Sequence, residues 1–170
     1  MKENILQKMT IGTVLFDQAK GAAVVTLVEE SGDRMLPIFI GLWEGMAIYR
    51  ELNRVPAQRP MLHDLFCNIL QGLHTHLEKV VVDSMRDNTY FARLHFMQHD
   101  APLIADARPS DAIALAVKFQ APIYVAEDIL VTAGKSTQGA VAEEKSAATT
   151  TEDVQAWLEN IRPEDFADPQ

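Results

Sequence analysis

The chain has 170 residues, of which 48% are hydrophobic, and its formal net charge at pH 7 is −9. This length fits one ordinary domain with an extension and is short for two full domains. No apolar run approaches the roughly 18 residues of a membrane-spanning helix, and the first residues lack the apolar stretch of a signal peptide. The single cysteine, Cys67, excludes an internal disulfide and a cysteine-cluster zinc site. We therefore expect a cytoplasmic protein that does not contact a membrane.

The negative charge is spread unevenly along the chain. Residues 134–170 contain eight acidic and three basic residues, whereas residues 1–133 contain sixteen and twelve. Because the nucleic-acid backbone is itself negative, this balance argues against a basic surface that dominates the molecule. A local basic groove on residues 1–133 is still compatible with the composition.

The first half of the chain predicts three strands followed by two helices. Residues 8–16, 22–29 and 34–40 have strand patterns, and turn-forming residues separate them. Gly41 ends the third segment, and residues 42–52 have a helical pattern. Pro56 and Pro60 interrupt the chain before a second helix. The apolar face of that helix consists of Leu62, Leu65, Phe66, Ile69, Leu70, Leu73 and Leu77.

The next segments predict a hairpin, a helix and a short strand. Residues 79–85 and 90–97 have strand patterns on either side of a turn at residues 86–89. A helix begins near Ser110 and runs to residue 119, and Pro122 opens a strand over residues 123–126. Cys67, inside the apolar pattern of the second helix, is interpreted as a core residue and not as a nucleophile.

Composition divides the chain into three parts. Residues 1–133 are a domain with continuous hydrophobic patterning, residues 134–151 are small and polar and predict a flexible linker, and residues 152–170 predict a short helix and an acidic tail. Hairpins dominate the strand connections of the domain. We therefore expect a single α/β domain of the α+β type, with a mostly antiparallel or mixed sheet and helices packed on it.

A group of polar residues precedes the helix that begins near Ser110. Pro109 disfavours a helical conformation at Arg108, Ser110 is a suitable helix N-cap, and Asp111 in the first turn complements the helix dipole. In a functional interpretation, Asp106 and Asp111 share a divalent cation, and Arg108 or the helix N-terminus contacts a phosphate. In a structural interpretation, Ser110 and Asp111 only cap the helix, and Arg108 pairs with a nearby carboxylate.

Arg59, His63 and Asp64 lie at the start of the second helix. Histidine side chains titrate near neutral pH, so His63 could act as a general acid or base if a carboxylate orients its ring. Adjacent residues on a helix diverge by roughly 100°, so we expect a carboxylate other than Asp64 in this role. The structural alternative is that Asp64 favours the helix N-terminus and His63 packs there.

Two further motifs carry polar residues at the ends of predicted elements. Glu44 follows a strand-to-helix junction with two glycines, which predict tight packing or a close approach to a ligand. Glu44 is interpreted either as an acid of the first helical turn or as a metal ligand. Asn88 is either a residue of the hairpin turn or a contact to a substrate. With one cysteine and no histidine pair at i, i+4, any metal would be a hard cation such as Mg²⁺ or Mn²⁺ held by carboxylates.

Together these segments resemble the bifunctional nuclease domain family. Four motifs within residues 8–130 carry the resemblance: residues 36–41 (LPIFIG) with Glu44 and Gly45, residues 59–65 (RPMLHDL), residues 87–92 (DNTYFA) and residues 106–113 (DARPSDAI). Residues 157–166 also resemble the tail motif of bacterial members. The resemblance implies a wedge-shaped domain that dimerises, and nuclease activity on RNA and DNA, attributed chiefly to plant members. Members often have Thr before the His-Asp pair; Leu62 replaces it here, so the usual helix cap is lost.

The leading hypothesis is a metal-assisted nuclease that hydrolyses phosphodiester bonds of RNA and DNA. The residues assigned to catalysis are His63, Asp64, Asp106, Arg108 and Asp111, those assigned to substrate binding are Arg59, Asn88 and Ser110, and those assigned to Mg²⁺ or Mn²⁺ are Glu44, Asp106 and Asp111. The alternative is a non-enzymatic dimeric module that binds a small ligand or a protein. A third hypothesis is nucleotide binding without hydrolysis, at the helix start near Ser110. Under the nuclease hypothesis, the catalytic residues converge in one cleft.

Overall fold

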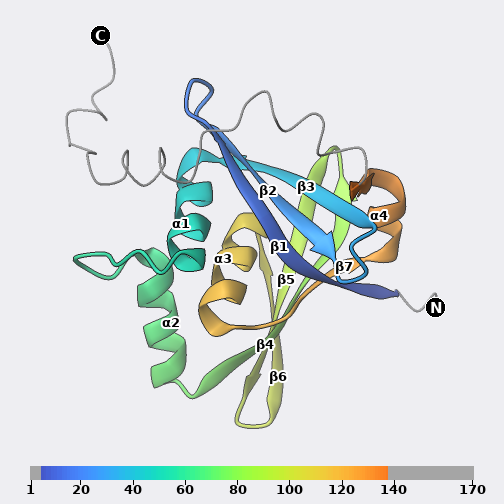
Figure 1. Ribbon diagram of the computed structural model, residues 1–170. Coiled ribbons are helices and arrows are strands. Elements are labelled where there is room, and N and C mark those ends of the chain that lie inside the picture. The colour runs from blue at the N-terminus through green and yellow to red at the C-terminus, as the bar shows by residue number, and fades with distance from the viewer. Residues whose placement is uncertain (1–4, 138–170) are drawn as a thin grey trace.

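The structure is a computed structural model, and it describes residues 5–137 (Figure 1). The predicted helix and tail at residues 152–170 lie outside the described residues, as does most of the predicted linker. The first linker residues are described: Lys135 and Ser136 form strand β8, which pairs with Met35 and Arg34.

One eight-stranded sheet runs through the described residues in the order β6-β5-β4-β7-β1-β2-β3-β8. Its other strands are β1 (Leu6–Asp17), β2 (Ala22–Glu29), β3 (Arg34–Gly41), β4 (Thr75–Arg86), β5 (Thr89–Gln98), β6 (Ala101–Ala107) and β7 (Ile123–Ala126). The β4–β7 pair is parallel and the other pairs are antiparallel. The predicted mixed sheet is therefore confirmed, and the central parallel pair joins two antiparallel halves.

Four helices pack on this sheet in the described part of the chain: α1 (Leu42–Leu52), α2 (Leu62–Gly72), α3 (Pro109–Phe119) and α4 (Glu127–Ala133). Helices α1, α2 and α3 lie together on one side in Figure 1, and α4 lies on the opposite side. Helix α3 contacts both α1 and α2 and rests on β4 and β5. This central place explains why residues 112–116 of α3 are all buried. None of the helices among residues 5–137 is long and apolar enough to cross a membrane.

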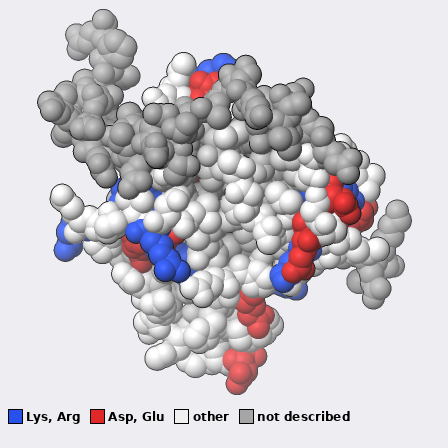
Figure 2. All heavy atoms as spheres, in the orientation of Figure 1, with Lys and Arg blue, Asp and Glu red and all other residues white. Residues whose placement is uncertain are grey.

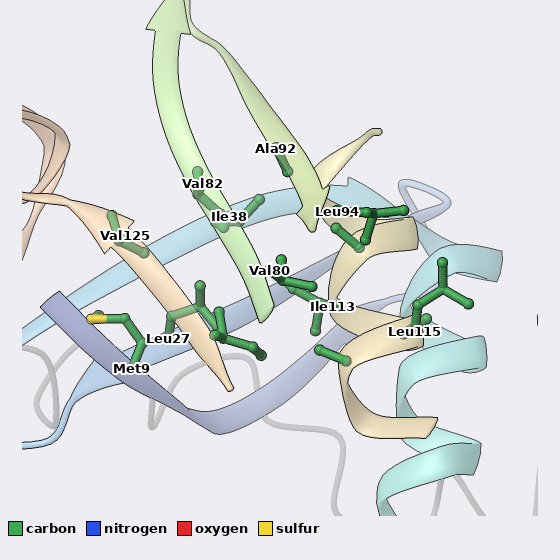
Figure 3. Close-up of a cluster of buried hydrophobic side chains, with 14 of the residues drawn as sticks. Met9, Leu27, Ile38, Val80, Val82, Ala92, Leu94, Ile113, Leu115 and Val125 are labelled. Carbon is green, nitrogen blue, oxygen red and sulfur yellow. The ribbon is translucent and has the colours of Figure 1, made fainter. Parts of the chain in front are cut away.

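The hydrophobic core lies between α3 and the middle of the sheet (Figure 3). Val80 and Val82 of β4, Val125 of β7 and Ile113 of α3 are all completely buried. Val81, which points to the opposite face of β4, is buried as well. A strand that is buried on both faces is typical of the centre of a sheet covered by other elements.

Gly45 lets helix α1 approach the sheet closely. A Cβ atom at this position would collide with the Cβ of Ala23 on β2 and press on the ring of Phe16 on β1. A Cβ at Gly41 would collide with the carboxylate of Glu44. The prediction of tight packing at the two glycines is confirmed, and the tight packing fixes the start of α1, where Glu44 lies.

The second helix is shorter than its apolar pattern predicts. It ends at Gly72, and His74 has a left-handed φ of 54°, so the chain turns into β4 before Leu77. The prediction that Leu77 continues the helical face is wrong, because Thr75 and Leu77 are buried at the alternating positions of a strand. Strands β6 and β8 and helix α4 were not predicted. Strand β6 has a mostly exposed surface, so its sequence lacks the alternation that marks a half-buried strand.

The predicted apolar face of α2 is only partly buried. Cys67 and Leu70 point into the core. The remaining large apolar side chains of this face stay exposed, and Leu62 has the largest exposed fraction, 76%. We call these side chains the α2 apolar face: Leu62, Leu65, Phe66, Ile69 and Leu73.

Candidate functional site

A large cleft in the described part of the chain lies between α1, the loop that follows it, and the starts of α2 and α3. Its volume is about 940 Å³. The polar side chains that line it are Glu44, Arg50, Glu51, Arg54, Gln58, Arg59, His63, Asp64, Asn68, Arg108, Asp111 and Lys118. Segments distant in sequence thus meet at one hollow, because α3 packs against both α1 and α2.

Arg108 lies at the centre of the polar network of this cleft. It precedes Pro109, which is the first residue of α3, and its backbone is extended (φ −66°, ψ 144°), as the proline predicts. Its Nε donates to Oδ2 of Asp111 at 2.7 Å, its Nη2 donates to Oδ1 of Asp111 at 3.2 Å, and its Nη1 donates to Oε1 of Glu44 at 2.9 Å. Arg108 therefore links the first turns of α1 and α3.

Asp111 also contacts His63, although 48 residues separate them in the sequence. The Nε2 atom of His63 lies 3.1 Å from Oδ1 of Asp111. Burial alone would raise the pKa of Asp111, but the hydrogen bonds from Arg108 and His63 outweigh this effect and hold that pKa below its usual value. An ionised carboxylate only accepts hydrogen bonds, so Nε2 of His63 is the donor. In the neutral ring, Nδ1 is then the basic nitrogen.

Asp64 has a different set of partners. Its Oδ2 accepts from the backbone N–H of Met61 at 2.7 Å, and its other oxygen pairs with Lys118. The hydrogen bond from Lys118 is the main reason that the pKa of Asp64 is lowered. Asp64 thus bonds back to Met61, which is the N-cap residue of α2. The expectation of a lost cap at Leu62 is wrong, because Leu62 is the first residue of the helix. As expected, a carboxylate other than Asp64 lies next to His63.

The other predicted site residues divide between the cleft and its surroundings. Arg59 is exposed and lines the cleft. Asp106 is exposed on β6, where it lies opposite Arg93 of β5, and it does not line the cleft. Ser110 is buried in the first turn of α3, and Arg108 holds the N-cap position. The prediction of Ser110 as the N-cap is therefore wrong: Pro109 is the first helical residue, so the N-cap lies two residues earlier, at Arg108.

A second, smaller hollow lies beside the cleft, with a volume of about 330 Å³. It lies between the end of β3, the turn between β4 and β5, and the start of α3. The residues that line it are Ile38, Phe39, Ile40, Gly41, Glu44, Asn88, Thr89, Tyr90, Arg108, Pro109 and Ser110. Glu44 and Arg108 line both hollows, so the two meet at the ion pair of these residues. Members of all four sequence motifs thus surround Arg108.

Several basic residues of the cleft were not predicted. Arg50, Arg54 and Lys118 join Arg59 and Arg108, so that five basic and four acidic side chains line the cleft. Lys118 is paired with Glu51 and Asp64, whereas neither Arg54 nor Arg59 is in an ion pair within residues 5–137. Basic and acidic side chains lie close together on the side of α1 and α2 in Figure 2. The net charge of the chain could not predict these cations, because it does not report how charges are grouped on the folded surface.

The donor set for the predicted divalent cation does not gather in the structure. Among residues 5–137, no three His, Cys, Asp or Glu side chains are grouped so that they could hold a metal ion. Glu44 and Asp111 face each other across the guanidinium of Arg108, and Asp106 lies apart on β6. The positive charge between the two carboxylates comes from Arg108.

Comparisons with known proteins identify the family of this chain. Residues 25–138 match the model of the family described as the bifunctional nuclease domain. The chain belongs to this family. An uncharacterized protein of Mycobacterium tuberculosis is 35% identical over 153 residues, which cover 88% of this chain and 92% of that protein.

Two rice proteins (Oryza sativa subsp. japonica) are more distant relatives. Bifunctional nuclease 1 is 25% identical over 114 residues, and bifunctional nuclease 2 is 24% identical over 112 residues. The matches cover 65% and 64% of this chain but only 34% of each rice protein. The shared part therefore corresponds to one portion of the plant proteins.

Proposed function

We propose that this chain is a nuclease that hydrolyses phosphodiester bonds of RNA and DNA at the cluster of His63, Asp111 and Arg108. The observation that carries the proposal is the 3.1 Å contact between His63 and Asp111 in a cleft with several arginines. Membership of the bifunctional nuclease domain family supports it, as do the names of the rice relatives.

His63 is assigned the role of general base. Asp111 fixes the ring through Nε2 and stabilises the imidazolium that forms, while Nδ1 takes a proton from the attacking water. The new P–O bond forms as the bond to the leaving oxygen breaks on the opposite side of the phosphorus, and the leaving oxygen takes its proton from solvent. Asp111 is thus a positioning residue.

Arg108 is assigned to the charge of the reacting phosphate. A guanidinium has five N–H donors, and the contacts to Glu44 and Asp111 engage three of them. The side chain of Arg108 is 65% exposed, so the remaining donors are accessible to a ligand. Because two carboxylates flank this one cation, the attraction for a polyanion must come from further arginines of the cleft, Arg50, Arg54 and Arg59.

The sequence suggested that Mg²⁺ or Mn²⁺ neutralises the charge of the reacting phosphate. We assign this role to Arg108 instead. The two carboxylates that could reach a common cation already share the guanidinium. No step of the proposed reaction is therefore assigned to a metal.

The test is cleavage of fluorescent single-stranded RNA and DNA oligonucleotides by the purified full chain and two variants. His63→Ala removes the base and is expected to lower the rate constant by about 10²–10⁴-fold, the usual contribution of general acid–base catalysis. Arg108→Ala is expected to lower it by a similar factor, since charge stabilisation in the transition state is lost.

The matched control is His76→Ala, which removes an exposed histidine of β4 that does not line the cleft. Its rate should equal that of the wild type. If the His63→Ala variant cleaves as fast as the wild type, the activity comes from a contaminating nuclease, and this result would reject the proposal. Absence of cleavage by the wild type would reject it too.

A second candidate function is binding without catalysis by a dimeric module. The observation that favours it is the exposed α2 apolar face, because monomeric proteins seldom leave such a row of large apolar side chains on one helix exposed to water. We propose that this face meets the same face of a second copy across a twofold axis, since an isologous contact pairs identical apolar rows. The dimer is compatible with either function, as is the cytoplasmic location expected from the sequence.

A further inference from the structure

The two hollows that meet at Arg108 differ in their chemistry. The larger cleft contains the indole of Trp43 and the arginines of α1 and the following loop. The smaller hollow contains two aromatic rings, Phe39 and Tyr90, and the amide of Asn88. Volumes of about 940 Å³ and 330 Å³ both fall within the usual range of small-molecule pockets, roughly 300–1,000 Å³.

Aromatic rings beside a cation suit nucleotides, because every base offers a π-face for stacking and every phosphate offers a negative charge. Phe39 is 78% exposed on β3, which is unusual for a phenylalanine in the middle of a fold and gives a ligand access to its ring. Asn88 lies in the two-residue turn between β4 and β5 with a φ of 57°, and its amide can both donate and accept hydrogen bonds.

We propose that the substrate is a single strand that lies across Arg108, with the reacting phosphate at Arg108 and His63 and one nucleoside on each side. The smaller hollow holds the base of one neighbouring nucleotide against Phe39, and the larger cleft holds the other neighbour. This inference rests on the proposed function and specifies its substrate class. A base in a duplex is stacked on both faces and paired along one edge, so it cannot enter a hollow of this kind without leaving the helix.

The test uses the dinucleotide thymidylyl-thymidine and two analogues in which one or the other nucleoside is replaced by an abasic deoxyribose. All three probes carry the same phosphodiester charge. Binding to the wild type and to Phe39→Ala is followed by NMR titration, which measures weak dissociation constants. Loss of one base stack corresponds to about a 5- to 150-fold change in affinity. We expect Phe39→Ala to weaken the complete dinucleotide by about tenfold.

The abasic analogues form a double-mutant cycle with Phe39→Ala. For the analogue that lacks the base in the smaller hollow, the substitution should leave the dissociation constant unchanged; for the other analogue, it should still weaken binding by about tenfold. Leu103→Ala is the matched control, because Leu103 is a half-exposed apolar residue of β6 that lines neither hollow. It should not change binding of any probe.

The inference is overturned if Phe39→Ala weakens all three probes equally or none of them. It is also overturned if a longer oligonucleotide binds as tightly in a duplex as it does as a single strand. Cleavage of the fluorescent oligonucleotides is measured with the same protein preparations. If oligonucleotides are cleaved but the cycle shows no coupling, the two-sided site is wrong and the proposed nuclease stands. If coupling is seen without cleavage, the nuclease proposal fails and the nucleotide site remains.

Discussion

At the scale of single residues, Asp111 has three interactions: with the dipole of α3, with Arg108 and with His63. It is in the first turn of α3, where a carboxylate complements the helix dipole, as the sequence predicts. It also accepts hydrogen bonds from Arg108 and from His63. These contacts outweigh its partial burial, so its pKa lies below the ordinary value of 3.8. The carboxylate is therefore ionised throughout the neutral range, and His63 and Arg108 have a stable acceptor.

This lowered pKa predicts how stability depends on pH. The folded-state pKa of Asp111 is below its unfolded value. The ionised carboxylate therefore adds to the free energy of unfolding above about pH 3.8, and this stabilisation is lost as the pH falls through the folded-state pKa. Asp111→Asn removes this contribution. The difference in Tm between the wild type and Asp111→Asn, measured by circular dichroism, should therefore shrink as the pH falls below about 4.

Two observations on the same samples decide this prediction. Asp33→Asn serves as the control, because Asp33 is exposed and its carboxylate is in no ion pair within residues 5–137. Its Tm difference from the wild type should not narrow with acid. A Tm difference for Asp111→Asn that grows as the pH falls below about 4 would mean that the folded-state pKa of Asp111 is raised and that the assigned contacts are absent.

At the scale of elements, α2 combines two roles on its two faces. Cys67 and Leu70 anchor it to the core, and burial raises the pKa of the Cys67 thiol to about 11, in keeping with a core residue and not a nucleophile. The first turn of α2 presents His63 to the cleft. The α2 apolar face points away from the core, and of its members Leu62 also lines the cleft. Anchoring by a few residues leaves this face for a partner.

A double substitution, Leu65→Glu with Ile69→Glu, tests whether the partner is a second copy. Both positions are about half exposed, so the monomer should fold normally, whereas two carboxylates facing two others across a twofold axis should raise the dimer dissociation constant at least tenfold. Size-exclusion chromatography with light scattering measures the mass. Val131→Glu, on the exposed surface of α4, is the control and should stay dimeric. A monomeric wild type at micromolar concentration, or a double variant that remains dimeric, would reject this interface.

At the scale of the whole molecule, the site exists because three helices meet over one sheet. Helix α3 packs against α1 and α2, so three different helix starts meet: Glu44 and Asp111 bind Arg108, and His63 contacts Asp111. Helix starts suit this task because the N–H groups of the first turn have no partner within the helix and can bind side chains or ligands. The sheet supplies the rest: the β4–β5 turn and the end of β3 close the smaller hollow.

The arrangement predicts that nuclease activity does not depend on a divalent cation. Treatment with EDTA followed by gel filtration should leave the cleavage rate within about twofold of the untreated rate, since Arg108 supplies the positive charge that a metal would otherwise supply. Cleavage of a fluorescent oligonucleotide is the measurement. Loss of activity that Mg²⁺ or Mn²⁺ restores, together with inactivation by Asp106→Ala, would instead support the metal-assisted mechanism inferred from the sequence.

Local pattern was sufficient to predict most of the elements. Strand β2, helix α1 and strand β7 have the predicted bounds, because hydrophobic periodicity and breaker residues are properties of the neighbouring sequence. The same holds for the first-turn positions of Glu44 and Asp111 and for the extended backbone of Arg108 before Pro109. Strand β6 was missed for the converse reason: its exposed edge has no periodic apolar face to detect.

The composition of the site was decided by the tertiary structure. The sequence required a carboxylate for His63 but could not identify Asp111, because the contact depends on how α2 and α3 pack across 48 intervening residues. Asp106 and Asp111 are close in sequence, yet one lies on an edge strand and the other in a helical turn, so proximity along the chain did not bring them into one cleft. Chain geometry over a few residues follows from local sterics, whereas the side chains that meet in a cleft are selected by the packing of the entire core.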